Sequence, residues 1–252
     1  MSTISVLSTI LLILMLLIGH KHGWQAFLGL VINFVLLFIG IALMAFQIPP
    51  VIVLIVVGTS ILAVTIFTGN DDLAVTTTSF WSSLIVLVIL SGLIVLVNYH
   101  AMIQGFSNEQ SDEVAGFSVQ IGISFLQIAT VSMIFSSLGA IAEASIAVAT
   151  GLEEVLEHQQ LSTTQFLLSG FHIGQQIIGT TLNTLFFGLF GSSLALFIWF
   201  SQLNYSLEQI INNQILGQAL IELLMSFLGV LLIVPVTTLV LKHRQLDKQN
   251  QQ

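Results

Sequence analysis

Apolar runs of membrane-spanning length recur along almost the whole chain. Hydrophobic residues make up 56% of the 252 residues and charged residues only 6%, a balance that water-soluble domains do not have. Because about 20 apolar residues cross a bilayer core of about 30 Å, such runs take up most of the chain. The sequence therefore predicts an integral membrane protein, a single membrane domain over residues 1–252 in contact with the lipid bilayer.

These apolar runs favour helices over strands. A backbone that faces lipid must satisfy its own hydrogen bonds, and a helix does this within one segment. The runs are also too long and unbroken for the alternating strands of a membrane barrel. We predict an all-α, polytopic helical bundle with about seven transmembrane helices. The spans are placed approximately at residues 4–19, 24–46, 51–67, 80–97, 117–141, 177–200 and 215–241.

The basic residues indicate an orientation for these spans. Lys21 follows the first span and Lys242 opens the polar tail 242–252, so seven spans place both residues on the same side. Because basic loops face the cytoplasm, we expect the N-terminus outside, the C-terminus in the cytoplasm and the acidic loop 109–113 outside. The first span has no basic residue before it, which is the reverse of a secretory signal peptide.

The composition also excludes several classes of function. Twelve acids against four bases give a net charge of -8, so the chain offers no basic patch to nucleic acid. The chain has no cysteine, which excludes disulfides and thiolate zinc sites. His20, His22 and His158 lack zinc spacing, and no His-Glu-x-x-His, Gly-x-Ser-x-Gly or phosphate loop is present. We therefore expect no enzyme activity, no cofactor and no metal site.

Polar residues gather in one part of this apolar chain, residues 142–176, between spans five and six. We predict a glycine-punctuated polar helix–loop–helix there, either re-entrant or interfacial. On its first helix, Glu143, Thr150 and Glu154 fall on one face at helical spacing. On its second helix, His172 and Gln176 share a narrow arc with Asn183 of span six, and Thr180 lies at the edge of that arc. An earlier polar run, residues 69–79, is predicted to be a loop and helix cap before span four.

Glycines and a second acid complete the set of candidate residues. Gly170, Gly174 and Gly179 favour either tight helix packing or a local helix break. Glu222 lies in span seven on one face with Gln218 and is either a functional carboxylate or part of a solvated helix entry.

Three of the candidate residues, Glu143, His172 and Asn183, also allow two interpretations each. Glu143 is either a proton or cation site in the membrane or a residue of the wet interface beyond span five. His172 is either a proton shuttle or an interhelical hydrogen-bond donor. Asn183 is either a contact between helices or part of a pathway lining.

Three stretches resemble the YibE/F-like family of bacterial multispan membrane proteins. They are GAIAEASIAVATGLEE at 139–154, SGFHIGQQIIGTTLNTL at 169–185 and GSSL at 191–194, and the resemblance covers roughly residues 115–240. The family pattern has an Asp where Glu143 stands and a basic–acidic pair where Gln175 and Gln176 stand. Two amides in place of two charges suit a degenerate member of a pair. The resemblance is to the shorter, YibF type, and it implies a paralogous YibE-type partner or a homo-oligomer.

Together these features predict a protein of the bacterial cytoplasmic (inner) membrane that is a transporter, or a transporter subunit, for a small solute or ion. The alternative is a non-transporting membrane subunit or scaffold that assembles with a paralogous membrane protein. The candidate polar pathway comprises Glu143, Thr150, Glu154, His172, Gln176, Thr180, Asn183, Gln218 and Glu222.

Overall fold

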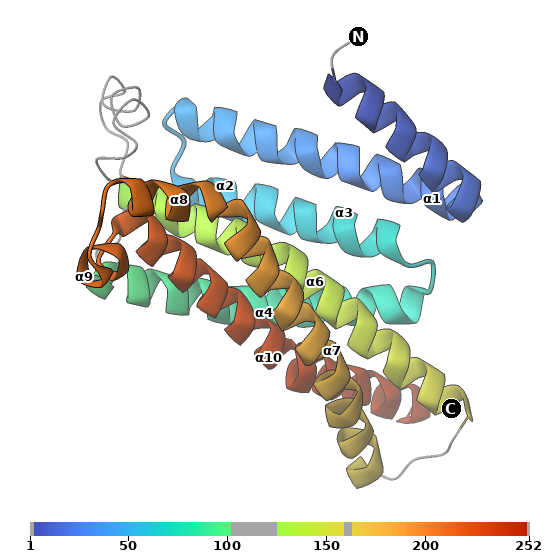
Figure 1. Cartoon of the computed structure of the whole chain (residues 1–252). Helices are drawn as coiled ribbons and strands as arrows, with labels where there is room; N and C mark the ends of the chain where they lie inside the picture. Colours follow the sequence, from blue (N-terminus) through green and yellow to red (C-terminus); the bar gives the residue numbers. More distant parts are fainter. Residues whose placement is uncertain (1–2, 102–124, 159–162, 251–252) are drawn as a thin grey trace.

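The computed structural model describes residues 3–101, 125–158 and 163–250, and the regular structure of these residues is entirely helical. Figure 1 shows the helices as one bundle. The first half of the chain contributes α1 (Thr3–Ala45), α2 (Pro50–Val53), the π-helical turn η1 (Leu54–Gly58), α3 (Thr59–Gly69) and α4 (Leu73–Ala101). The second half contributes α6 (Phe125–His158), α7 (Thr163–Ser192), α8 (Leu194–Gln202), α9 (Leu207–Ile211) and α10 (Gln214–Asn250).

Several of these helices have the length and apolar character of membrane spans. Among the described residues there are five such segments: α1, the run Pro50–Gly69, α4, Leu126–His158 of α6 and Gln214–Gln245 of α10. The pair α7 and α8, bent by 45° at its break, raises the number to six if it counts as one span. The prediction of an all-helical membrane protein is thereby confirmed, and the division into seven spans stays a prediction.

The long helix α1 consists of two arms that fold back on each other (Figure 1). The bend is at His20, whose backbone angles of φ 46° and ψ -118° are not helical. The second arm passes so close to the first that a Cβ atom at Gly23 would overlap the backbone of Met15. Glycine is therefore needed at this position. The two arms correspond to the spans expected at 4–19 and 24–46.

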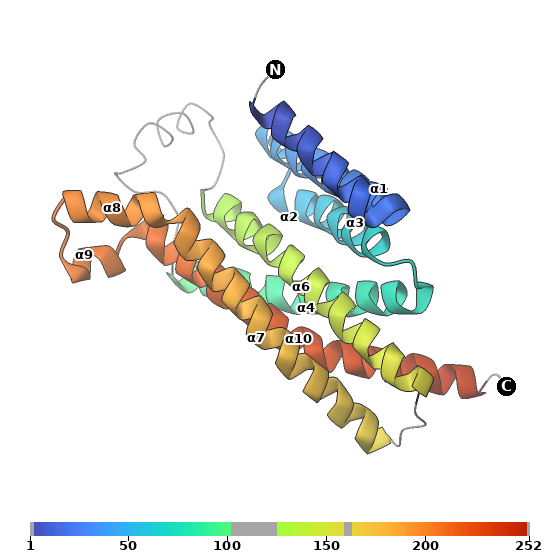
Figure 2. The same ribbon diagram turned by 45° about the vertical axis from the view of Figure 1, so that its right-hand side comes forward.

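The centre of the bundle is formed by α4, α6 and α10, which pack along one another. Leu90, Ile94, Met133, Ile141 and Ile233 from these three helices are fully buried. On one side, α7 packs against α6 and α10, and on the other side α3 packs against α4 and α6, with α1 outside α3 (Figure 2).

The start of α4 differs from the prediction. Residues 76–79 were expected in a loop or helix cap, but α4 begins at Leu73 and buries five hydroxyl residues. These are Thr76, Thr78, Ser79, Ser82 and Ser83. Small hydroxyl side chains can bond to a carbonyl of their own helix, as Ser82 does to the Thr78 carbonyl oxygen at 2.7 Å, and so they suit a tight helix crossing.

The polar segment at 142–176 is a pair of helices, and both are continuous with the neighbouring apolar helices. The first continues α6 to His158 and the second is the beginning of α7 from Thr163. The residues between them, 159–162, lie outside the described residues, as do the acidic loop at 109–113 and the expected start of span five at 117–124. Span six, expected to be continuous over 177–200, is broken after Ser192 beside the weak helix formers Gly191 and Ser193.

Candidate functional site

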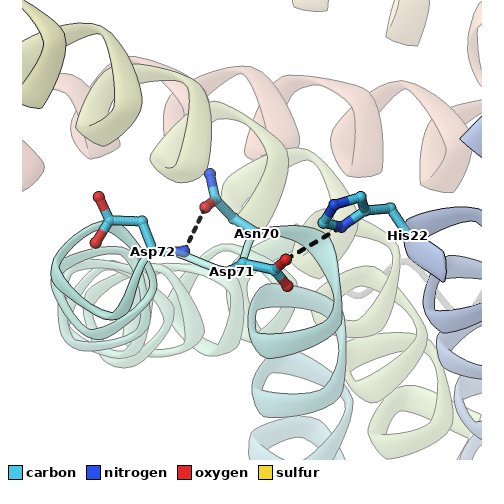
Figure 3. A network of polar contacts seen from close by, with 4 residues as sticks. All are labelled: His22, Asn70, Asp71 and Asp72. Carbon is cyan, nitrogen blue, oxygen red and sulfur yellow. Dashed lines mark hydrogen bonds and ion pairs between the residues drawn. The ribbon is translucent and has the colours of Figure 1, made fainter.

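One end of the bundle carries the bend of α1, the α3–α4 connection and the basic end of α10. The imidazole of His22 lies 3.2 Å from a carboxylate oxygen of Asp71 (Figure 3). The side-chain oxygen of Asn70 accepts a hydrogen bond from the backbone nitrogen of Asp72 at 2.8 Å. The guanidinium of Arg244 donates to the carbonyl oxygen of Ala74, the second residue of α4, at 2.9 Å. The segments that contain Lys21 and Lys242 are therefore brought to the same end.

A strip of small and polar side chains follows the exposed face of α6, which we call the α6 strip. It contains Ser132, Ser136, Gly139, Glu143, Ala147, Thr150 and Glu154, and all but the half-buried Ala147 are exposed. Glu143 lies midway along α6, between the more buried residues on both sides of it in the sequence. Glu143 therefore lies within a helix that is long and apolar enough to span a membrane.

The α6 strip runs between two flanks that other helices cover. On one flank, Ile146 lies 3.4 Å from where a Cβ atom of Gly69 in α3 would be. On the other flank, Ile173 of α7 lies 3.0 Å from the corresponding position of Gly151. Between the flanks the strip is open, since a Cβ atom at Gly139 would have no neighbour within 4 Å. Near the end of the strip that carries Thr150 and Glu154, the side-chain amide of Asn70 donates a hydrogen bond to the Thr150 hydroxyl at 3.3 Å.

A cavity of about 270 Å³ lies among α6, α7 and α10, near the end of the strip that carries Ser136. Glu222 of α10 is half-buried in it, and Ser136 of α6 lines the same cavity beside Glu222. Three further hydroxyl residues, Thr184, Ser192 and Ser226, contribute to the lining. Because Ser136 belongs both to the cavity and to the strip, the cavity around Glu222 meets the face of α6 that carries Glu143 at this residue.

The register of α6 and α7 sets the depth of these residues. The two helices are antiparallel: Gly151 packs against Ile173, while Ser136 and Gly188 line the same cavity. Glu143 therefore lies level with the part of α7 from Thr180 to Thr184. Thr180 is exposed one turn before Thr184, and its hydroxyl donates to the carbonyl of Ile177 in its own helix at 3.0 Å.

The other candidate polar residues of α7, His172, Gln176 and Asn183, lie on a different face of this helix. Gly170 and Gly174 face α10 so closely that a Cβ atom would overlap Thr238 and Val234 respectively. His172, Gln176 and Asn183 are all exposed and lie on the opposite side of α7 from those glycines. The structure does not bring these three together with Glu222, and we call them the α7 outer face.

Gly179 and Gln218 also lie apart from the cavity. Gly179 is exposed, with open space where a Cβ atom would be, and α7 continues through it without a break. Gln218 is half-buried one turn before Glu222, and its side-chain oxygen has no hydrogen-bond partner. It is not among the residues that line the cavity.

Several polar residues of this region were not singled out from the sequence. Ser136, Ser192 and Ser226 line the cavity, and Asn98 of α4 is buried with only 1% of its surface exposed. Ser226 follows Glu222 by one helical turn, so periodicity could have suggested it. Ser136 could not have been matched with Glu222, because their proximity depends on how α6 packs against α10.

Taken together, a bundle of membrane-length helices with an acidic polar cavity between three of them defines a multi-helix membrane protein. The family model of the YibE/F-like protein matches residues 7–244, nearly the whole chain, so the chain belongs to that family. The match extends the resemblance noted for residues 115–240 to the N-terminal half. No curated protein and no solved structure matches the chain. Among the described residues, no group of three or more His, Asp and Glu side chains could hold a metal ion.

Proposed function

We propose that this protein is a transporter, or the membrane subunit of a transporter, for a small solute or ion. The observation that supports the proposal is that the cavity around Glu222 and the α6 strip share Ser136, and that the strip carries Glu143, Thr150 and Glu154 further along α6. A carboxylate at membrane depth is costly unless it meets water, a ligand or another protein group. A polar path that extends along the bundle gives both carboxylates such surroundings.

The proposal includes a topology in the bacterial inner membrane. The two arms of α1, the run Pro50–Gly69, α4, α6, the pair α7–α8 and α10 make seven spans if each arm crosses the bilayer. The common end of Lys21, Lys242 and Arg244 then faces the cytoplasm and the N-terminus faces outward. In this orientation, the cavity lies in the outer half of the membrane and Thr150 near the cytoplasmic end. The proposed role involves no catalysis.

Uptake into proteoliposomes tests the transport function. Wild-type protein is expected to accumulate at least one member of a panel of protons, sodium, rubidium, phosphate and amino acids above the level of empty liposomes. Glu143→Gln removes the carboxylate midway along the α6 strip and should reduce that uptake to background. Glu208→Gln, at an exposed acid of the short helix α9, is the matched control and should leave uptake unchanged. Full uptake in the Glu143→Gln variant would refute the proposed path.

The α7 outer face favours a second function, assembly with another membrane subunit. His172, Gln176 and Asn183 project away from the chain's own helices, and polar side chains in lipid need hydrogen-bond partners. A paralogous membrane protein or a second copy of this chain would supply them. In this account the protein stabilises or orients its partner and carries no solute itself.

Cross-linking in native membranes separates the two functions. Asn183→Cys should form a cross-linked product if the α7 outer face is an interface, and the product's mass distinguishes a second copy from a larger paralogue. Val88→Cys, on the exposed apolar side of α4, is the matched control. An assembly account predicts cross-linking and no uptake, and a self-contained transporter predicts uptake without cross-linking at Asn183→Cys.

A further inference from the structure

The hydroxyl groups around Glu222 are arranged as hydrogen-bond acceptors. The Ser226 hydroxyl donates to the backbone carbonyl of Glu222 at 2.9 Å, and the Thr184 hydroxyl donates to the carbonyl of Thr180 at 3.0 Å. The Ser192 hydroxyl donates to the carbonyl of Leu189 at 2.9 Å. Because each hydroxyl has one proton, these three present only oxygen lone pairs to the cavity.

The fourth hydroxyl follows the same rule. Ser136 lies beside Glu222 in the same lining, and because an ionised carboxylate only accepts hydrogen bonds, the Ser136 hydroxyl can only donate to it and keeps its own lone pairs. Among the described residues, none of those that line the cavity is Lys, Arg or His. The lining therefore lacks the donors and positive charges that bind an anion, and it offers five oxygen-bearing side chains to a cation.

We propose that this cavity binds a small monovalent inorganic cation, with Glu222 as its charged ligand and the four hydroxyls as neutral ligands. This cation site adds a ligand class to the proposed transport function, and the physiological role of the site rests on that function. Hard oxygen donors suit alkali and alkaline-earth ions rather than soft metals. A single carboxylate balances one positive charge, whereas calcium sites usually combine several carboxylates and carbonyls.

The apolar part of the lining narrows the chemical class of the ligand further. In the part of the chain that the structure describes, it consists of Leu185, Leu189, Leu223, Gly188 and Ala219, none of which is aromatic. Quaternary and other organic ammonium ions are typically held by aromatic faces, so a cavity without them disfavours such ligands. A volume of about 270 Å³ exceeds that of a bare ion, and since a water occupies about 30 Å³, the cation can keep part of its hydration shell.

Direct binding of radioactive sodium and rubidium to the purified full-length protein in detergent tests this site. Saturable binding of at least one of the two ions is expected. The unlabelled ion should displace the bound radioactive ion, choline should not, and calcium should do so only at higher concentration. Glu222→Gln should weaken binding about tenfold or more, because it removes the only charged ligand. Ser136→Ala should weaken it less, and the control Glu208→Gln should not change it. Gel filtration and thermal unfolding establish that each variant is folded.

The outcomes separate this site from the transport function. The cation site is refuted if neither ion binds, if calcium displaces more strongly than sodium, or if folded Glu222→Gln binds as the wild type does. Wild-type binding that Glu222→Gln abolishes supports the site even if proteoliposomes show no uptake, in which case transport alone fails. Uptake that depends on Glu143 in a protein that binds neither sodium nor rubidium would leave transport standing and refute the cation site.

Discussion

Ser136 on α6 and Glu222 on α10 line the same cavity, and Ser136 also lies on the exposed face of α6 that carries Glu143. Ser136 lies two helical turns before Glu143 on the exposed side of α6. The cavity that contains Glu222 therefore meets the α6 strip at Ser136. Without this shared residue, Glu222 would be an acid in a cavity and Glu143 an isolated exposed acid. The position of Ser136 is the reason for treating both residues as parts of one path.

The close approach of α7 and α10 at Gly174 predicts a stability effect. Gly174→Ala places a methyl group against Val234 and should lower the free energy of unfolding by about 1–3 kcal/mol, as overpacked cores do. Gly179→Ala introduces the same methyl group into open space and should be neutral or slightly stabilising. Unfolding of the two purified variants in increasing SDS provides the measurement. Equal loss of stability in both would contradict the packing described at Gly174.

Arg244 should stabilise the end of the bundle where α10 meets the start of α4. Its guanidinium donates at 2.9 Å both to the Ala74 carbonyl and to the hydroxyl of Thr78, which is fully buried. Arg244→Gln removes the charged donor and should cost about 1.5–3 kcal/mol, the range for hydrogen bonds that involve a charged group. Lys242→Gln removes an equal charge near the same helix end and serves as control. If both variants lose the same stability in thermal unfolding, net charge rather than these two contacts is responsible.

Asn98 should couple α4 to α6 at the other end. Its amide donates to the Thr130 hydroxyl at 2.7 Å and to the Leu126 carbonyl at 3.3 Å, at a site where Asn98 is almost completely buried. A double-mutant cycle with Asn98→Ala and Thr130→Ala should give a coupling energy of about 0.6–1.7 kcal/mol, as for interhelical hydrogen bonds in membranes. Additive losses of stability would show that this contact does not form in the membrane.

The chain has no native cysteine, so single cysteines can map its topology without background labelling. Asp71→Cys, at the end that carries Arg244, should react with a membrane-impermeant maleimide only after the membrane is permeabilised. Gln47→Cys and Asn204→Cys, in exposed turns beyond α1 and α8, should react in intact cells. Reaction at Asp71→Cys in intact cells would reverse the proposed orientation, and reaction at only one of the two outer positions would contradict the number of spans.

Hydrophobic run length and helical periodicity predicted much of this fold. Charge-free runs located the long helices, since a helix in lipid must be apolar over a fixed length. Periodicity placed Glu143, Thr150 and Glu154 on one face, and they share the exposed face of α6. The closely packed α7 glycines are explained by the same reasoning, because Gly170 and Gly174 meet α10 where a side chain would not fit.

Features that depend on neighbouring helices could not be predicted in this way. The hydroxyl run at residues 76–79 has the composition of a loop, yet it belongs to α4, where tertiary packing buries Thr76, Thr78 and Ser79. Periodicity showed that His172, Gln176 and Asn183 share an arc of α7 but not that this arc faces away from α6 and α10. The cavity that Ser136 and Glu222 share likewise joins residues far apart in sequence.

Water access to the α6 strip is the measurement that tests the proposed path most directly, because it requires no knowledge of the solute. Gly139→Cys and Ala147→Cys flank Glu143 on the strip, Val148→Cys is fully buried beside it, and Val88→Cys faces outward from α4. A small water-soluble thiol reagent in native membranes should modify the two strip positions and neither control. The account is contradicted if the strip positions react only with a lipid-soluble reagent, as Val88→Cys should, because the α6 strip would then face lipid and carry no aqueous path.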